Sequence, residues 1–149
     1  MPQFVSSVPI GHLQNYLLLT VDFTSATWNT AATHELFTVT GLVRMQLIPE
    51  CTEDLASAGG SISLGTETNT SGFIAATVAT TIDNGELWLT GTPIAFIAST
   101  SIIDDLVNGS DVGYEITVGA LTDGTMKFHC FWEPIGAGAT VVAGAGGVL

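Results

Sequence analysis

The sequence predicts an all-β protein, folded as a single β-sandwich of jelly-roll type. Apolar and polar residues alternate along short segments, which is the period of a strand with one buried face. Turn residues separate these segments at short intervals. The chain also has 21 threonines among 149 residues and only 11% charged residues, and β-branched threonine suits a pleated surface with one wet face. A closed β-barrel is the alternative that these observations leave open.

The first half of the chain is expected to hold three strands, at residues 17–24, 35–40 and 42–48. Pro49 is expected to end the third strand, because proline has no N–H to contribute to a ladder. The next segment, ECTEDLASAGG, clusters its acids around Leu55 and ends in two glycines. It is therefore predicted to be a loop with room for one helical turn.

The second half is expected to hold strands at residues 61–68, 73–82 and 86–90, and an apolar segment at 94–103 that forms one long strand or two short ones. Asp83-Asn84-Gly85 predicts a hairpin turn, because Asn and Gly tolerate positive φ. The segment DDLVNGSD is expected to be a loop.

The clearest hairpin prediction is Thr122-Asp123-Gly124-Thr125, between strands at residues 112–121 and 125–133. On the second strand, alternation places Phe131 on the face opposite Trp132. The side chains expected on the core face are Met126, Phe128, Cys130 and Trp132. Cys130 is accordingly interpreted as a buried free thiol that packs as a small hydrophobe.

Two segments are expected to lie outside the sandwich, which is assigned to residues 17–134. Residues 1–16 are interpreted as an extended N-terminal arm, and residues 135–149 as a Gly/Ala-rich C-terminal arm without charge. Small residues let backbones approach closely, and a partner surface is needed to offset the entropy of ordering them. The C-terminal segment is therefore interpreted as an assembly arm. Its expected contacts are Ile135, Val141, Val142, Val148 and Leu149.

The charge of the chain argues against several classes of partner. Two basic residues and fourteen acidic ones give a formal net charge of -12. Nucleic acids and anionic membranes are both bound through Lys and Arg, so neither is expected as a partner. No apolar stretch is long enough to span a membrane. The first residues lack the Lys or Arg of a secretory leader, so synthesis without export is expected.

No motif assigns a reaction, a cofactor or a metal to this sequence. The histidines lack the spacing of zinc ligands, and neither a G-x-S-x-G turn nor a phosphate-binding loop is present. We therefore predict no enzyme activity and no catalytic, cofactor-binding or metal-ligating residue. The three histidines are His12, His34 and His129.

Two features bear on the alternative of ligand binding. Loop acids are interpreted as solvated charges that keep the protein soluble, and calcium ligation is the alternative. Trp28 lies in the polar segment TSATWNTAAT and is the tryptophan expected to be exposed, where it would face a ligand such as a sugar. The acids concerned are Glu53, Asp54, Asp104, Asp105 and Asp111.

Two long segments carry a resemblance to a known class of proteins. TSATWNTAATHELFTVTGLVRMQLIPECTEDLASAGGSISLG and DVGYEITVGALTDGTMKFHCFWEPIGAGATVVAGAGG resemble small, mostly uncharacterised proteins encoded among the virion structural genes of tailed bacteriophages. The resemblance implies a virion component. Jelly-roll or other β-sandwich proteins that decorate the capsid or form head fibres, often as trimers, fit the size of the chain. A tail or baseplate component is the neighbouring interpretation.

The expected function is therefore that of a non-enzymatic structural protein of a phage virion, made in the host cytoplasm. Its expected partners are copies of itself, as a homotrimer, and a major capsid protein or other virion protein bound through the arms. A carbohydrate-binding or host-adhesion module is the alternative.

Overall fold

The computed structural model describes residues 15–96 and 100–146. These residues form eleven β-strands and one 3₁₀ turn, so the all-β prediction is confirmed. The strands are β1 (Asn15–Asp22), β2 (Thr33–Thr40), β3 (Leu42–Ser57), β4 (Ser61–Thr66), β5 (Asn69–Val78), β6 (Glu86–Leu87), β7 (Ile94–Ala95), β8 (Ile103–Asn108), β9 (Val112–Thr117), β10 (Leu121–Pro134) and β11 (Thr140–Ala143).

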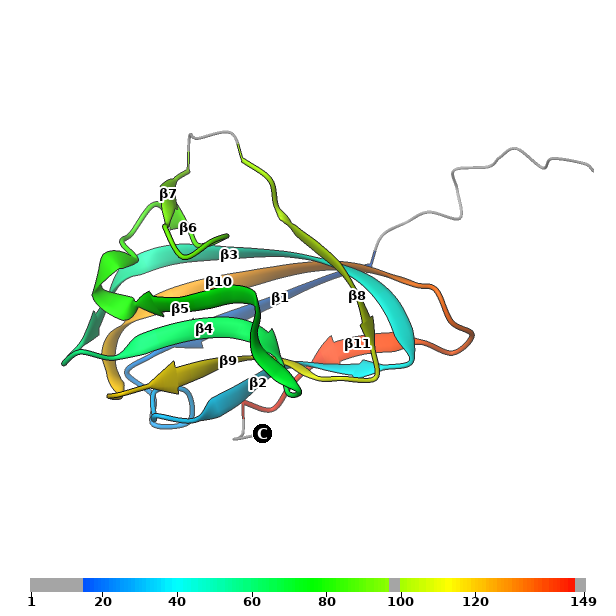
Figure 1. Ribbon diagram of the computed structural model, residues 1–149, viewed down its shortest axis with the longest axis horizontal. Helices are drawn as coiled ribbons and strands as arrows, with labels where there is room; N and C mark the ends of the chain where they lie inside the picture. The colour runs from blue at the N-terminus through cyan, green and yellow to red at the C-terminus, as the bar shows by residue number, and fades with distance from the viewer. Residues whose placement is uncertain (1–14, 97–99, 147–149) are drawn as a thin grey trace, which may run out of the picture.

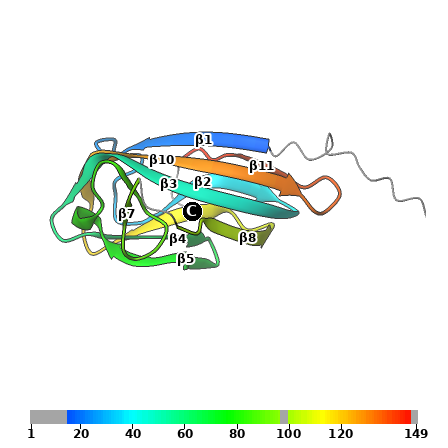
Figure 2. The same ribbon diagram turned by 90° about the horizontal axis from the view of Figure 1, so that it is seen from above.

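The strands form two antiparallel sheets that pack face to face (Figures 1 and 2). The six-stranded sheet, here sheet A, has the order β1-β10-β3-β6-β7, and β8 also pairs with β3. The five-stranded sheet, here sheet B, has the order β11-β2-β9-β4-β5. Both sheets are open, so the molecule is a sandwich and the closed-barrel alternative is wrong.

A single hydrophobic core lies between the two sheets. The alternation of side chains along the strands forms this core, because every second residue of β3 and β10 points inward. Trp88 and Tyr114 are the largest fully buried side chains, and the Trp88 indole nitrogen donates to the Thr77 hydroxyl at 3.0 Å, so burial leaves it satisfied. The expected core face of β10 is confirmed, with Trp132 packed partly buried against the buried Met126, Phe128 and Cys130.

Strand β3 does not end at Pro49 but continues to Ser57. On one side, Pro49 is paired with Phe128 of β10. On the other side, the Pro49 carbonyl accepts a hydrogen bond from the Trp88 N–H at 3.0 Å. The N–H and C=O of a strand residue point the same way, so the missing N–H faces the side of β6 and β8. The β8 ladder has already ended there, opposite Leu47, and no donor is needed. The loop predicted after Pro49 is therefore strand.

The hairpin predicted at Thr122–Thr125 does not form. Strand β9 lies in sheet B and β10 in sheet A, so the two are not paired with each other. Gly124 lies inside β10, at a shift of register against β3. Its φ is 109°, and a Cβ there would lie 2.6 Å from the Leu55 side chain and 2.7 Å from the Asp54 carbonyl. The glycine permits a bulge and a close strand approach instead of a turn.

The chain crosses from sheet B to sheet A in a tight turn centred on Val118. The Gly119 N–H donates to the Thr117 carbonyl at 2.9 Å, which closes a three-residue γ-turn. Val118 has a φ of 74° and is the only non-glycine residue with positive φ among the described residues. Its side chain is 87% exposed, so packing does not compensate for this conformation.

Two further predictions in the second half of the chain are corrected. The Asp83-Asn84-Gly85 turn forms, but its returning strand β6 has two residues and pairs with β3 and β7, not with β5. Strand β8 occupies most of the segment DDLVNGSD, which was expected to be a loop. Its acids are tolerated because they are exposed, and Asp104 faces Arg44 on the outside of the sheet.

Part of the segment assigned to the C-terminal arm belongs to the sandwich. Residues 140–143 form β11, which is paired with β2 in sheet B. Val141 is 3% exposed and lies in the core, whereas Ile135 and Val142 are exposed. Val148, Leu149 and residues 1–14 lie outside the described residues, and the last two residues of the expected N-terminal arm begin β1.

Candidate functional site

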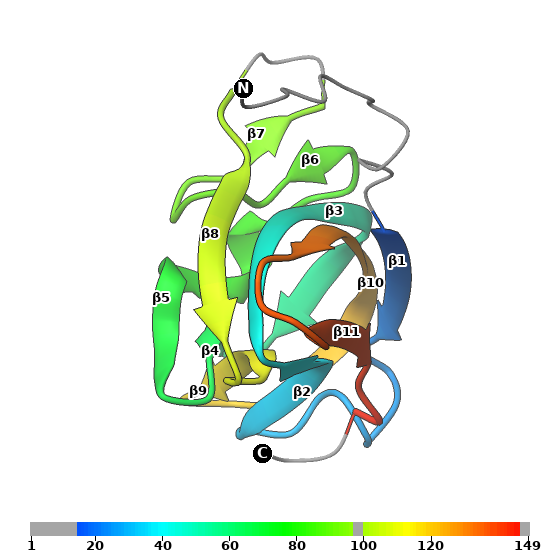
Figure 3. The ribbon, with the colours of Figure 1, turned by 90° about the vertical axis from the view of Figure 1, so that its right-hand side faces the viewer.

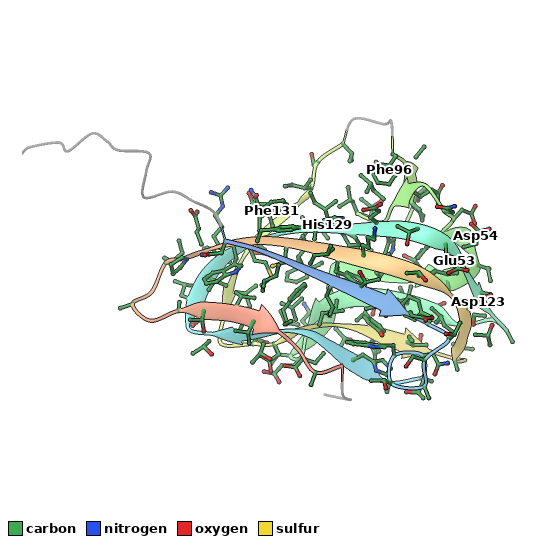
Figure 4. All side chains as sticks on the ribbon, turned by 180° about the vertical axis from the view of Figure 1, so that it is seen from behind. Glu53, Asp54, Phe96, Asp123, His129 and Phe131 are labelled. Carbon is green, nitrogen blue, oxygen red and sulfur yellow. The ribbon has the colours of Figure 1, made fainter. Side chains whose placement is uncertain are left out.

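The outer surface of sheet A carries a patch of apolar and aromatic side chains on the N-terminal half of β1 and the C-terminal half of β10. The register between β1 and β10 brings these side chains together, because Tyr16 lies opposite Phe131, and Leu18 lies opposite His129. On the other side of β10, His129 lies opposite Ile48 of β3. Figure 4 shows His129 and Phe131 on this side of the molecule. We call this patch the aromatic face: Tyr16, Leu18, Ile48, His129 and Phe131.

The rings of the aromatic face lie close together. The ring centroids of Tyr16 and Phe131 are 4.9 Å apart. The Tyr16 and His129 rings are stacked, with centroids 6.1 Å apart and an interplanar angle of 23°. Tyr16 is 48% exposed and Leu18 is 46% exposed. An apolar patch with a half-exposed aromatic ring is typical of sites that contact another molecule.

Hydrogen bonds fix the histidine at the centre of this face. The His129 Nε2 atom lies 2.7 Å from the Glu50 Oε2 atom, and the Nδ1 atom lies 2.8 Å from the Tyr16 hydroxyl oxygen. Because the Glu50 carboxylate accepts, Nε2 carries a proton, and in the neutral ring Nδ1 accepts the Tyr16 O–H. The trio has the order of a nucleophile, a base and an orienting acid. It lies on the outer surface of a sheet, where the two hydrogen bonds hold the three side chains together.

Charged side chains border the aromatic face, whose own five residues include no Asp, Glu, Lys or Arg. Both basic residues of the chain, Arg44 on β3 and Lys127 on β10, belong to sheet A. The Arg44 guanidinium donates to both oxygens of Asp104, at 2.7 and 3.0 Å, and lies 3.4 Å from Glu133. The hydrogen bonds from Arg44 lower the pKa of Asp104. Arg44 therefore offsets the charge of only one of the two carboxylates beside it.

A pocket of about 510 Å³ lies at one end of β3 and β10 and is acidic. Figure 4 shows its three carboxylates, Glu53, Asp54 and Asp123, at that end of the molecule. Each already accepts a hydrogen bond: Glu53 from the Thr125 hydroxyl at 2.9 Å, Asp54 from the Asn84 N–H at 2.7 Å, and Asp123 from the Gly124 N–H at 2.9 Å. The carboxylates thus hold the backbone and side chains that surround them.

The loop acids considered for calcium do not converge. Asp104 faces Arg44, and Asp111 accepts a hydrogen bond from the Val39 N–H at 2.9 Å. Within residues 15–96 and 100–146, no group of three or more His, Cys, Asp or Glu residues is arranged to hold a metal ion. His34 is buried, its Nε2 atom 2.8 Å from the Thr30 carbonyl, and is stacked on Tyr114. These residues have structural contacts in place of a shared ligand.

Trp28 is partly buried, not exposed as expected. Its ring packs against the core, with its centroid 6.4 Å from that of Tyr114. Its carbonyl accepts the Tyr114 hydroxyl at 2.6 Å. Gly146 lies so close that a Cβ there would overlap the indole ring. The C-terminal segment beyond β11 therefore covers the surface that a sugar would need for stacking.

Both cysteines are buried free thiols, which confirms the prediction for Cys130. Burial raises the pKa of Cys51 to about 11 and that of Cys130 to about 12. A nucleophilic cysteine needs a lowered pKa, because the thiolate is the reactive form. The two thiols therefore suit packing and not catalysis.

Sequence reasoning did not single out Tyr16, His129 or Phe131 as site residues. The alternation that assigned Met126 and Phe128 to the core also places His129 and Phe131 on the outer face. An aromatic residue on the outer face of a strand was therefore the signal in the sequence that could have indicated this site.

No protein-family model, curated protein or solved structure matches the chain. The described residues contain no helix long and apolar enough to cross a membrane.

Proposed function

We propose that the protein is a non-enzymatic structural component of a tailed-phage virion, a capsid-decoration or head-associated protein. In this proposal it associates with copies of itself and binds a major capsid protein or another virion protein. The observation that carries the proposal is the aromatic face, a partly exposed apolar surface without Asp, Glu, Lys or Arg on a protein of net charge -12. Interface centres are depleted of charge and enriched in aromatic residues, as this surface is.

We further propose that the sandwich is a jelly roll. Apart from the short strands β6, β7 and β11, eight strands remain. In chain order, the first of these eight pairs with the last, the second with the second-last, and so on to the middle pair. The four pairs are β1 with β10, β2 with β9, β3 with β8, and β4 with β5. This nested pairing supports a long hairpin wound into two Greek keys, the topology of many viral capsid and lectin domains. Fold alone does not assign function, so the aromatic face has to carry the argument.

The charge distribution supports a location on the outside of a particle. An acidic surface is repelled by packaged DNA, whereas the apolar aromatic face is free to approach another protein. Two exposed side chains of the C-terminal segment, Ile135 and Val142, lie on the remaining surface and supply a second contact. Because Val141 is buried, it contributes to the fold and not to this contact.

The proposal is tested by co-sedimentation of the purified protein with phage particles that lack it. We expect saturable binding that Phe131→Ser weakens about tenfold or more, since a central aromatic contact is worth more than about 1 kcal/mol. Val78→Ser is the matched control, because Val78 is 50% exposed on β5 of the other sheet. Failure of the wild-type protein to bind particles, or equal loss in both variants, contradicts the proposal.

A carbohydrate-binding or host-adhesion module is the second candidate, and one observation favours it. The Tyr16 and Phe131 rings lie beside the polar groups of His129 and Glu50, and sugars are bound by aromatic stacking with hydrogen bonds alongside. A glycan array with and without chelator tests this function. Glycan binding that Phe131→Ser abolishes supports the candidate, and absence of binding in both conditions removes it.

A further inference from the structure

The outer edge of β1 is a regular and unprotected strand edge. Eight consecutive residue pairs join β1 to β10, from Asn15 opposite Trp132 to Asp22 opposite Thr125, without a shift of register. The sheet order ends at β1, so no described strand is paired with its other side (Figure 3). In an antiparallel strand, alternate residues direct their N–H and C=O groups to each side. Half of the β1 backbone groups therefore point outward, available to another strand.

The other sheet edges among the described residues carry devices that prevent pairing. Strand β7 has two residues and β11 has four, which is too short for a stable ladder. Strand β8 carries two adjacent acids, Asp104 and Asp105. The ladder between β5 and β4 is interrupted twice, on both sides of the pair formed by Leu64. By contrast, β1 has no charged residue from Asn15 to Val21 and contains no proline.

We propose that two copies of this chain pair through β1, so that both six-stranded sheets join into one continuous antiparallel sheet. The inference rests on the self-association in the proposed function. It gives a dimer with two-fold symmetry in place of the homotrimer expected from the sequence. A strand pairs with its own copy around a two-fold axis only in the antiparallel direction. Copies with a net charge of -12 repel each other and meet most easily where charge is lowest. The uncharged β1 edge, beside Lys127 of β10, meets that condition.

The pleat of β1 sets the register of this pairing. Tyr16, Leu18 and Thr20 are exposed on the outer face, whereas the residues between them point toward the core. Residues opposite each other must lie on the same face of the joined sheet. A two-fold axis at Leu18 satisfies this rule, because it places Leu18 opposite Leu18 of the second copy and Tyr16 opposite Thr20. The charged Asp22 then lies outside the paired segment of residues 15–21.

This arrangement has a consequence for binding. The two aromatic faces lie on the same side of the joined sheet, next to the axis, because each includes Tyr16 and Leu18 of β1. The dimer therefore presents one surface about twice as wide as that of the monomer. A repeated partner such as a capsid lattice can engage both halves, which raises the apparent affinity without any new contact.

Sedimentation analysis of the full chain over a range of concentration and salt tests the pairing. We expect a dimer of twice the 15.4 kDa monomer mass, whose dissociation constant falls as salt screens the negative charge. Leu18→Lys and Leu18→Glu should each weaken dimerisation about tenfold or more, because two like-charged side chains then face each other across the axis, with their Cβ atoms about 5 Å apart. An equimolar mixture of the two variants should restore the dimer, since opposite charges then meet.

Leu106→Lys and Leu106→Glu are the matched controls, because Leu106 is 61% exposed on β8 of the same sheet. These controls should dimerise as the wild type does, alone and mixed. A dimer or trimer that survives Leu18→Lys overturns the edge pairing and leaves self-association intact. A wild-type monomer that still binds particles overturns the pairing and the self-association, and leaves the binding to a virion protein intact. A wild-type monomer that binds no particles overturns the proposed function as well.

Discussion

Replacement of Val118 by glycine is expected to stabilise the protein. Val118 lies at the centre of the γ-turn between the two sheets with a φ of 74°, a conformation that β-branched residues adopt only under strain. Relief of such strain is worth roughly 1–3 kcal/mol. The side chain is 87% exposed, so its removal costs little burial. Glycine also increases the entropy of the unfolded chain, which lowers the free energy of unfolding by about 0.4–1 kcal/mol.

The expected net gain is therefore about 1 kcal/mol in the free energy of unfolding, or a rise in Tm of about 2–4 °C for a domain of this size. Urea unfolding followed by tryptophan fluorescence measures it. Val142→Gly is the control, since Val142 is exposed in the extended strand β11, where glycine should cost about 0.5–1 kcal/mol. If Val118→Gly lowers stability as Val142→Gly does, the turn at Val118 stores no strain and the reasoning fails.

Three further outcomes are expected from the same unfolding assays. Val141→Ala should lower the free energy of unfolding by about 2 kcal/mol because Val141 is 3% exposed, whereas Val142→Ala should change it little; equal effects would contradict the place of β11 in the core. Gly124→Ala should destabilise by about 2 kcal/mol or more, because the new methyl group meets Leu55 at a positive φ; an unchanged urea midpoint would contradict the close approach. Burial raises the pKa of Cys51 to about 11 and of Cys130 to about 12, so above about pH 8.5 the unfolded chain loses thiol protons that the folded chain keeps. Stability should therefore fall as the pH rises from there toward 11, and a thiol reagent should label both cysteines only after unfolding; rapid labelling of the native protein would contradict their burial.

Alternation predicted the strands well where one face is apolar and the other polar. The core face of β10, with Met126 and Phe128, follows from that pattern alone. Pairing was harder, because a local turn signature such as Asp123-Gly124 does not reveal which sheet each neighbouring strand joins. The close approach of Gly124 to Leu55 depends on a residue far away in the sequence, so the glycine was read as a turn.

The candidate site was less predictable than the fold for the same reason. His129 is 113 residues from Tyr16 and 79 residues from Glu50, and only the registers of β10 with β1 and β3 bring the three together. Trp28 was expected to be exposed because its sequence neighbours are polar. Gly146, more than a hundred residues later, covers its ring. Long-range packing therefore decided which aromatic side chains remained at the surface.

The central position of β10 in sheet A governs the order in which the sheet can assemble. Strands β1 and β3 both depend on β10 and are not paired with each other. On the ribosome, β1 therefore waits as a free apolar segment until residues 121–134 have emerged. Pairing between such distant segments is slow, and unpaired strands are prone to aggregate in the meantime. We accordingly expect slow folding and a dependence on chaperones during synthesis, even though the finished sandwich has a well-packed core.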